Sequence, residues 1–434
     1  MTTLKRTVST PGAVLLGLGS ILGTGVFVSL AVVAGAASVW MPLAVLLGGL
    51  VAALNGLSSA QLASVHPVAG GTYAYGRRFL SPSAGFVAGW FFLVAKSASA
   101  ATAALGVVGY AAHLLGQPGV PRLQAGLLAL AVVLLMAWWV DRGLKRSNAA
   151  NAVLVTVTLA ALVVFIAFAT NGAATPDGLA DLERTPAALD VRGVLFGAAL
   201  AFVAFTGYGR VATLGEEVKN PRRTIPIAVV LTLVTVLTVY LAVAFAGLSI
   251  FGPNGAPFAA LAWSLSLEGA AAPLASLLSL AGSAPAWAVW AVSVGAVTAM
   301  VGVLLNLLLG LSRVAFAMGR DGELPPPLGR LDRAGVTPRL AVWAVAGLVG
   351  LIALWGDVRL AWTFSAVNVL IYYALTNLAA LQVKEGRFVP KAVSVLGLIG
   401  CLSLAVFIPW PTWLLAGGFL ATGILIRFAV LTRS

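Results

Sequence analysis

The sequence predicts an all-α integral membrane protein with twelve transmembrane helices, and two observations predict it. Of the 434 residues, 60% are hydrophobic and only 9% are charged, whereas an average soluble domain is about 25% charged. The hydrophobic residues also fall into long runs, and an α-helix needs about 20 mostly apolar residues to cross a bilayer. So few charges could hardly cover the surface of a soluble protein of this length, which argues against soluble enzymes and disordered proteins.

Cutting the chain at charges and at Pro- or Gly-rich breaks gives the twelve candidate spans. They are residues 12–36, 40–63, 83–114, 122–140, 148–170, 192–214, 226–250, 285–318, 339–355, 358–381, 390–408 and 411–431. The segment 252–284 is apolar but contains Pro253, Pro257 and Pro273, so we expect an external loop with short lateral helices there. The first span lacks a clean small-residue cleavage site behind it, so we expect it to be retained.

The basic residues are divided unequally between the two sides that twelve spans define. The side with both termini holds 20 of the 26 Lys and Arg residues, the other side holds four, and Lys96 and Arg210 lie within spans. Cytoplasmic loops of membrane proteins retain Lys and Arg, so we expect both termini in the cytoplasm. The net charge of +13 is then mostly a topology signal, and no nucleic-acid partner is expected.

Glycine clusters interrupt the first and the sixth predicted span. Residues 17–27 read GLGSILGTGVF and residues 202–210 read FVAFTGYGR. Inside a helix glycine costs about 1 kcal/mol relative to alanine, and unwound backbone at membrane depth is tolerated only where it lines a cavity or is buried in protein. The alternative is that these glycines allow close helix packing. Because the two clusters open two five-span units, their positions favour a transporter site near the bilayer midplane.

An odd number of spans in each unit would invert the second unit relative to the first. The N-terminus of a half-helix attracts an anion, and its unwound carbonyls and C-terminal ends attract a cation. A zwitterion carries both charges a few ångströms apart. The predicted site therefore favours an amino acid or a similar small molecule.

Four motifs resemble those of the amino acid–polyamine–organocation (APC) permeases. They are GSILGTGVF at 19–27, PVAGGTYAY at 67–75, FVAFTGY at 202–208 followed by EEVKNPRRTIP at 216–226, and LSRVAFAMGRDGELP at 311–325. The resemblance implies a LeuT-type fold, in which a 5+5 inverted repeat is followed by two C-terminal helices. A single transporter domain, 1–434, would then contain a first repeat at 12–170, a second at 192–381 and the extra helices at 390–431.

The resemblance also implies which groups bind the substrate. The substrate carboxylate would meet the backbone N–H groups of Gly23, Thr24 and Gly25. The substrate amine would meet the backbone carbonyls of Ile21, Val203, Ala204 and Thr206. The family often has an aromatic gate at or near position 203, which is valine here. Phe202 and Phe205 flank it, and either could cover the substrate or simply pack.

Two further residues of the predicted spans are coupling candidates. Lys96 lies about 20 Å into the third span at 1.5 Å per residue, and an intramembrane lysine is a functional hypothesis by default. It could titrate and couple transport to protons, contact the substrate, or be a structural cation on helix-end carbonyls. Thr158 matches the place where some proton-coupled relatives carry a lysine. Its hydroxyl could help to coordinate sodium, or it could bond to the preceding turn of its own helix.

The predicted cytoplasmic ends of the spans supply the gate candidates. Arg210 follows the break in the sixth span and could line the cytoplasmic path, pair with Glu216 or Glu217, or bind substrate. Glu216, Glu217 and Arg313 could form an inner gate, and an ordinary interfacial ion pair is the alternative.

These observations together predict a secondary active amino acid transporter of the cell membrane. Neutral L-amino acids are the expected substrates, because no Asp or Glu lies in a predicted span; acidic ones are an alternative through Lys96 or Arg210. Without a nucleotide-binding loop, we expect proton symport or exchange, with sodium coupling as an alternative. The spans lack clustered His, Asp, Glu and Cys, so neither an enzyme nor a metal or cofactor is expected. A non-transporting amino acid sensor is the alternative from another class.

Overall fold

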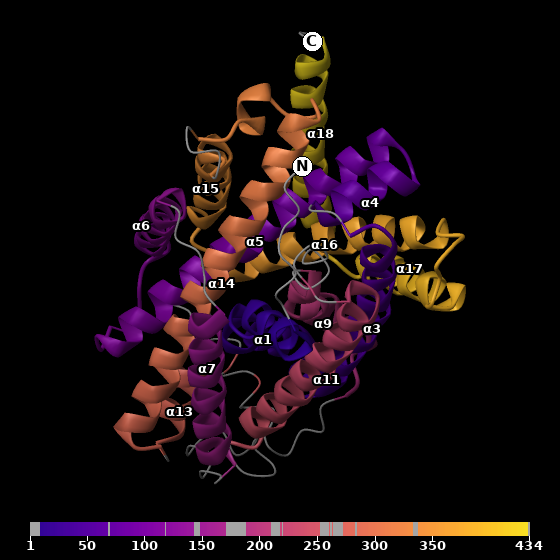
Figure 1. The fold of residues 1–434 in the computed structure, drawn as a ribbon. Helices are drawn as coiled ribbons and strands as arrows, with labels where there is room; N and C mark the ends of the chain where they lie inside the picture. Colours follow the sequence, from indigo (N-terminus) through magenta and orange to yellow (C-terminus); the bar gives the residue numbers. More distant parts are fainter. Residues whose placement is uncertain are drawn as a thin grey trace.

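The computed structural model describes residues 9–67, 70–117, 119–142, 148–170, 188–209, 218, 220–251, 260, 263, 272–282, 284–332 and 337–432. Helices make up the regular structure of these ranges (Figure 1). Nine helical segments among them are long and apolar enough to cross a membrane, and the first of these, Thr10–Val65, takes in two of the predicted spans. The chain is therefore a multi-pass membrane protein.

The first predicted repeat is built from nine consecutive helical elements. They are α1 (Thr10–Ile21), η1 (Gly25–Ser29), α2 (Leu30–Ala37), η2 (Ser38–Trp40), α3 (Met41–Val65), α4 (Gly71–Phe79), α5 (Pro82–Leu114), α6 (Arg122–Asp141) and α7 (Asn148–Ala169). All five spans predicted for this repeat correspond to helices. The short helix α4 was not predicted, because its mixed polar sequence and its nine residues carry no membrane-span signal.

The rest of the chain continues in the same way. Its elements are α9 (Val191–Phe205), η3 (Thr206–Tyr208), α11 (Pro221–Leu248), α13 (Pro273–Ala281), α14 (Ala286–Arg320), η4 (Pro326–Gly329), α15 (Arg339–Ala353), α16 (Val358–Leu381), α17 (Lys391–Val406) and α18 (Trp410–Leu431). The apolar helices α15 and α17 have only 15 and 16 residues. The count of twelve spans and the inverted repeat therefore stay predictions.

Local sequence explains where several helices begin. Proline stands in the first turn of α1, α5, α11, α13 and α18, where its missing N–H would have no partner in any case. The Ser81 hydroxyl accepts a hydrogen bond from the Ala84 N–H at 3.1 Å and caps α5. The Asp357 carboxylate caps α16 by accepting from the Leu360 N–H at 2.9 Å.

Helix α5 is the most enclosed of the long helices in the described ranges, with 94% of its most apolar stretch buried, against 11% for α18. It packs mainly against α14 and α16. Helix α1 contacts α7 and α11, while α3 packs against α9 and α11 (Figure 1). The interrupted elements α1–η1 and α9–η3 therefore lie within the bundle, where surrounding helices shield their unpaired backbone groups from lipid.

Candidate functional site

The predicted break in the first span is present. Helix α1 ends at Ile21, Leu22 is extended with φ −71° and ψ 100°, and helical structure resumes as the π-helix η1 from Gly25. The N–H groups of Val26 and Phe27 both donate to the Gly23 carbonyl, at 3.1 and 3.0 Å, and these are the first bonds of the resumed helix. A helix start leaves the N–H groups that precede its first bonds without intrahelical acceptors. This break therefore offers those earlier N–H groups as donors to an anion.

The sixth predicted span also changes conformation at the predicted place. Helix α9 ends at Phe205 and tightens into the 3₁₀ turn η3. This turn lies directly against the end of α1, because a Cβ on Gly207 would overlap with the backbone oxygen of Ser20 and lie 2.6 Å from Ile21 Cγ1. The two breaks therefore meet, and glycine at position 207 permits their contact.

Tyr240 of α11 connects the two interrupted elements. Its hydroxyl lies 3.2 Å from the carbonyl oxygen of Ile21 and 3.2 Å from that of Ala204, and it can donate to either. The Tyr240 side chain is fully buried, and its ring packs against Phe205 with 5.1 Å between centroids. A single hydroxyl thus ties the end of α1 to the end of α9.

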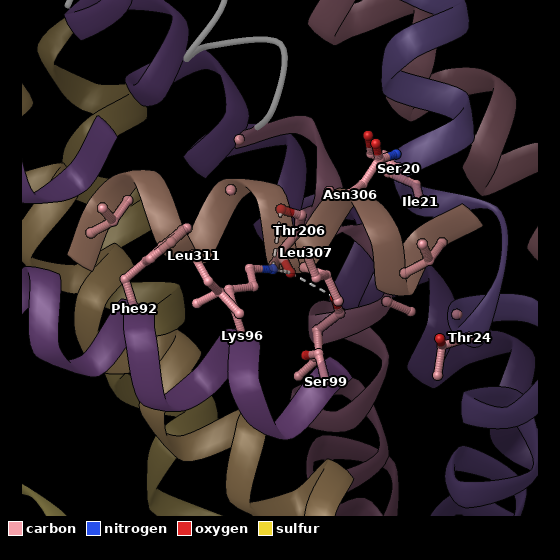
Figure 2. A pocket seen from close by; sticks show the side chains of 18 of the residues that line it. Ser20, Ile21, Thr24, Phe92, Lys96, Ser99, Thr206, Asn306, Leu307 and Leu311 are labelled. Carbon is pink, nitrogen blue, oxygen red and sulfur yellow. Dashed lines mark hydrogen bonds between the residues drawn. The ribbon is translucent and has the colours of Figure 1, made fainter. Parts of the chain in front are cut away.

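A pocket lies between these breaks and the helices α5 and α14 (Figure 2). It encloses about 1030 Å³ of space between atoms, part of it continuous with open solvent. The apolar part of its wall comes from Phe92, Val303, Leu307, Leu311, Val314 and Trp362, and the uncharged polar part from Ser20, Thr24, Ser99, Thr206 and Asn306. A mostly apolar wall with a few converging polar groups is typical of a small-molecule site.

Thr24 is the polar residue of the wall with the clearest free binding capacity. The residue is 3% exposed, and its hydroxyl has no hydrogen-bond partner among the residues that the structure describes. Buried hydroxyl groups are usually hydrogen-bonded. A ligand with an acceptor or donor at this point would satisfy it.

Lys96 reaches into the pocket from α5, and Figure 2 shows its amine directed at Thr206. Its Nζ donates to the Thr206 hydroxyl at 2.6 Å and to the Thr206 carbonyl at 3.4 Å. The same hydroxyl donates to the Val203 carbonyl at 2.7 Å. Lys96 is 7% exposed, and its ammonium lies at the C-terminal end of α9, where helix carbonyls carry a partial negative charge.

The charged lining residues of the pocket, within the described ranges, are Lys96 and Arg313, without an Asp or Glu. Those ranges also contain no group of three His, Cys, Asp or Glu that could hold a metal ion. The described lining therefore favours a ligand that carries a negatively charged group over a ligand whose charges are all positive.

The other predicted site residues are placed as follows. Ile21, Thr24, Gly25, Val203, Ala204, Thr206, Lys96 and Arg313 line the pocket, whereas Gly23, Phe202, Phe205 and Thr158 do not belong to its lining. Phe202 packs edge-to-face on Tyr373 with 5.6 Å between centroids. The Thr158 hydroxyl donates to the Leu154 carbonyl at 2.7 Å, within its own helix. Arg210, Glu216 and Glu217 lie outside the described residues.

The sequence analysis missed three polar residues of this region. Tyr240 bridges the breaks, Ser99 lines the pocket with its hydroxyl 2.9 Å from that of Ser365, and Asn306 Nδ2 donates to the Gly19 carbonyl at 3.5 Å. Asn306 stands alone in an apolar stretch of α14, and that isolation was the available signal. Nothing in the sequence distinguishes Tyr240 from other aromatic residues of the spans.

A second charged cluster lies where α14 ends. The carboxylate of Glu323 is paired with Arg77 at 3.1 Å and with Arg427 at 2.6 Å. Beside it, the Tyr73 hydroxyl donates to Asp321 at 2.8 Å. Burial, followed by this hydrogen bond, raises the pKa of Tyr73 above its ordinary value. The cluster joins α4 and α18 to the chain after α14, and the sequence analysis did not foresee it.

The Tyr240 contacts give a first prediction. In Tyr240→Phe the carbonyls of Ile21 and Ala204 lose their shared donor, and a buried acceptor without a partner costs about 1–3 kcal/mol. We expect the initial rate of amino acid uptake into proteoliposomes to fall roughly tenfold. Tyr75→Phe is the matched control, because the buried Tyr75 hydroxyl has no hydrogen-bond partner among the described residues. Equal rates in both variants would contradict the bridging role.

Comparison with known proteins places this geometry in context. Residues 12–430 match the family model of amino acid permeases. The chain is 38% identical over 425 residues to an uncharacterized transporter of Mycobacterium tuberculosis. The aligned region covers 97% of this chain and 90% of that protein. It is 28% identical to the methylthioribose transporter of Bacillus subtilis over 98% of this chain and 93% of that protein. It is 26% identical to a branched-chain amino acid permease of the same organism, over 95% of this chain and 92% of that protein.

Proposed function

The chain belongs to the amino acid permease family, and we propose that it is a secondary active transporter that moves neutral L-amino acids across the cell membrane by alternating access. Membership of this family and the named relatives support amino acid transport; the relatives are transporters and permeases rather than enzymes. Our proposal goes further in three respects: neutral amino acids as the substrate class, the source of energy for transport, and the cell membrane as the location.

The observation that carries the proposal is the meeting of two helix breaks at one pocket with a buried, unpartnered hydroxyl. Thr24 presents that hydroxyl beside the start of η1, where the first N–H groups of a helix favour an anion. Ile21, Ala204 and Thr206 line the same pocket and carry backbone carbonyls that favour a cation. We infer that the substrate carboxylate lies at Thr24 and that its amine faces the η3 side.

The pocket wall supports neutral side chains. No Asp or Glu stands among the lining residues that the structure describes, so a cationic substrate side chain would meet Lys96 without a compensating carboxylate. The apolar residues Phe92, Val303, Leu307 and Leu311 favour a medium-sized hydrocarbon side chain. Acidic amino acids, attracted by Lys96, are the second candidate substrates.

We further propose proton symport or exchange as the source of energy. The Thr158 hydroxyl donates to the Leu154 carbonyl, a bond within its own helix that leaves the oxygen lone pairs available; sodium coupling is therefore the alternative that the imposed gradients below distinguish. In this proposal both termini are cytoplasmic, the repeats occupy 12–170 and 192–381, and the helices of 390–431 follow them. Rocking of one helix bundle around the two breaks would expose the pocket alternately.

Uptake of radiolabelled amino acids into proteoliposomes tests this function. Leucine, glutamine, glutamate and arginine, under imposed pH or sodium gradients or with preloaded substrate, separate symport from exchange and neutral from acidic substrates. We expect saturable leucine uptake driven by a pH gradient or by preloaded amino acid. Saturable binding without uptake would instead indicate a sensor, and neither binding nor uptake of any amino acid would refute the proposal.

A further inference from the structure

The four carbonyls expected to receive the substrate amine already have donors within the protein. The Tyr240 hydroxyl reaches those of Ile21 and Ala204 at 3.2 Å, and the Thr206 hydroxyl donates to that of Val203 at 2.7 Å. The fourth carbonyl, that of Thr206, accepts from Lys96 Nζ at 3.4 Å. The part of the site that would bind a substrate ammonium therefore already receives hydrogen bonds from inside the protein, with the one hydrogen of the Tyr240 hydroxyl shared between two carbonyls.

Lys96 is the charged member of this set of donors. Its ammonium, like that of an amino acid, donates to the end of α9, with its shortest contact of 2.6 Å to the Thr206 hydroxyl. A cation at a helix C-terminus is stabilised by the partial negative charge of the last carbonyls. At one of the four carbonyls, that of Thr206, Lys96 thus makes the contact that a substrate amine would make.

When protonated, Lys96 has no acidic counterpart among the described residues of this region. Lys96 is 7% exposed, and the ion pairs of the described residues do not include it. The described lining of the pocket supplies no carboxylate. Because a buried charge without a counterion is unfavourable, a carboxylate held at Thr24 would stabilise the pocket. That carboxylate needs no ammonium of its own.

We propose that Lys96 is a tethered ammonium which completes the amine side of the site, so that this transporter also accepts carboxylates that lack an α-amino group, such as 2-oxo and 2-hydroxy acids. The inference rests on the proposed function, because it uses the same carboxylate position at Thr24. An amino acid must displace Lys96 from Thr206 before its own ammonium can bind there. A 2-oxo acid leaves the Lys96 contact intact.

Paired uptake measurements in proteoliposomes test the inference. The probes are radiolabelled leucine and its 2-oxo analogue, 4-methyl-2-oxopentanoate, at pH 7 with protein-free liposomes as background. The variant Lys96→Met keeps an unbranched side chain without charge and removes the Lys96 contacts to the Thr206 oxygens, leaving the contact from the Tyr373 hydroxyl to the Thr206 carbonyl in place. Lys391→Met is the matched control, because Lys391 is exposed at the start of α17 and outside the pocket lining.

In the wild type and in Lys391→Met we expect saturable uptake of the 2-oxo acid. In Lys96→Met the ratio of 2-oxo acid uptake to leucine uptake should fall roughly tenfold, the effect of losing one hydrogen bond or contact to a charged group. Lys96→Arg, which keeps the charge, should restore part of the ratio. The readout is a ratio of two uptake rates within one preparation. Partial misfolding of a variant lowers both rates together and therefore does not change the ratio.

Two results would overturn the inference. One is wild-type protein that takes up leucine but shows no saturable uptake of the 2-oxo acid. The other is an unchanged ratio in Lys96→Met. Failure of the proposed function gives a different result, since wild-type protein would then take up no amino acid, whatever it does with the 2-oxo acid. If Lys96→Met takes up neither probe, the wild-type uptake of the 2-oxo acid decides alone.

Discussion

Replacing Gly25 with alanine is expected to reduce amino acid uptake into proteoliposomes at least tenfold. A Cβ at this position would overlap with the Tyr240 hydroxyl and lie 3.1 Å from the Ala204 carbonyl oxygen. Tyr240 cannot move aside without losing its contacts to Ile21 and Ala204. Overpacking of a buried site typically costs about 1–3 kcal/mol, and here the cost falls on the junction of the two helix breaks.

Gly310→Ala is the control for Gly25→Ala. Gly310 lines the same pocket, but a Cβ there would meet nothing within 4 Å. We expect this variant to transport at nearly the wild-type rate, because it adds the same methyl group without contact. If both variants transport normally, the close approach at Gly25 does not matter for function. If both fail equally, the pocket tolerates no added volume, and the junction has no special role.

Glu323→Gln is expected to lower the thermal stability of the detergent-solubilised protein. The Glu323 side chain is 5% exposed and pairs with both Arg77 and Arg427. Removing one partner of a buried ion pair typically costs about 3–5 kcal/mol. We expect a loss near the lower end, about 3 kcal/mol, since the side chains of Arg77 and Arg427 are 39% and 20% exposed and water screens their charges.

The matched control for this prediction is Asp357→Asn. Asp357 pairs with Arg122, whose side chain is 75% exposed, and asparagine can still accept the capping hydrogen bond from Leu360. Exposed ion pairs contribute at most about 1 kcal/mol, so the apparent melting temperature should change much less than in Glu323→Gln. Equal melting temperatures for Glu323→Gln and the wild type would show that the cluster after α14 does not stabilise the fold.

The long helices could be predicted from the sequence because their signal is local. Each of the twelve predicted spans overlaps a helix in the ranges that the structure describes, since lipid requires a continuous apolar run whatever the neighbours are. The break after Ile21 and the tightening after Phe205 were predicted for a similar reason, because clustered glycines weaken a helix by themselves.

The polar contacts of the site could not be predicted, because each joins residues that are far apart in the chain. Lys96 meets Thr206 across 110 positions, and Tyr240 meets Ile21 across 219. Lys96 was recognised as unusual for its depth alone, with three roles left open. Which of its neighbours supplies an acceptor depends on how α5 and η3 are placed relative to each other within the bundle.

The sequence by itself determined that this protein is a helical membrane protein with interruptions in the first and sixth predicted spans, because hydropathy and glycine clustering act within one segment. Only the tertiary structure decided that those interruptions meet at a pocket, that Tyr240 bridges them and that the Lys96 ammonium lies on Thr206. These features arise when separate helices pack. A hydrogen bond is made at about 3 Å, and a sequence pattern does not specify distances between helices.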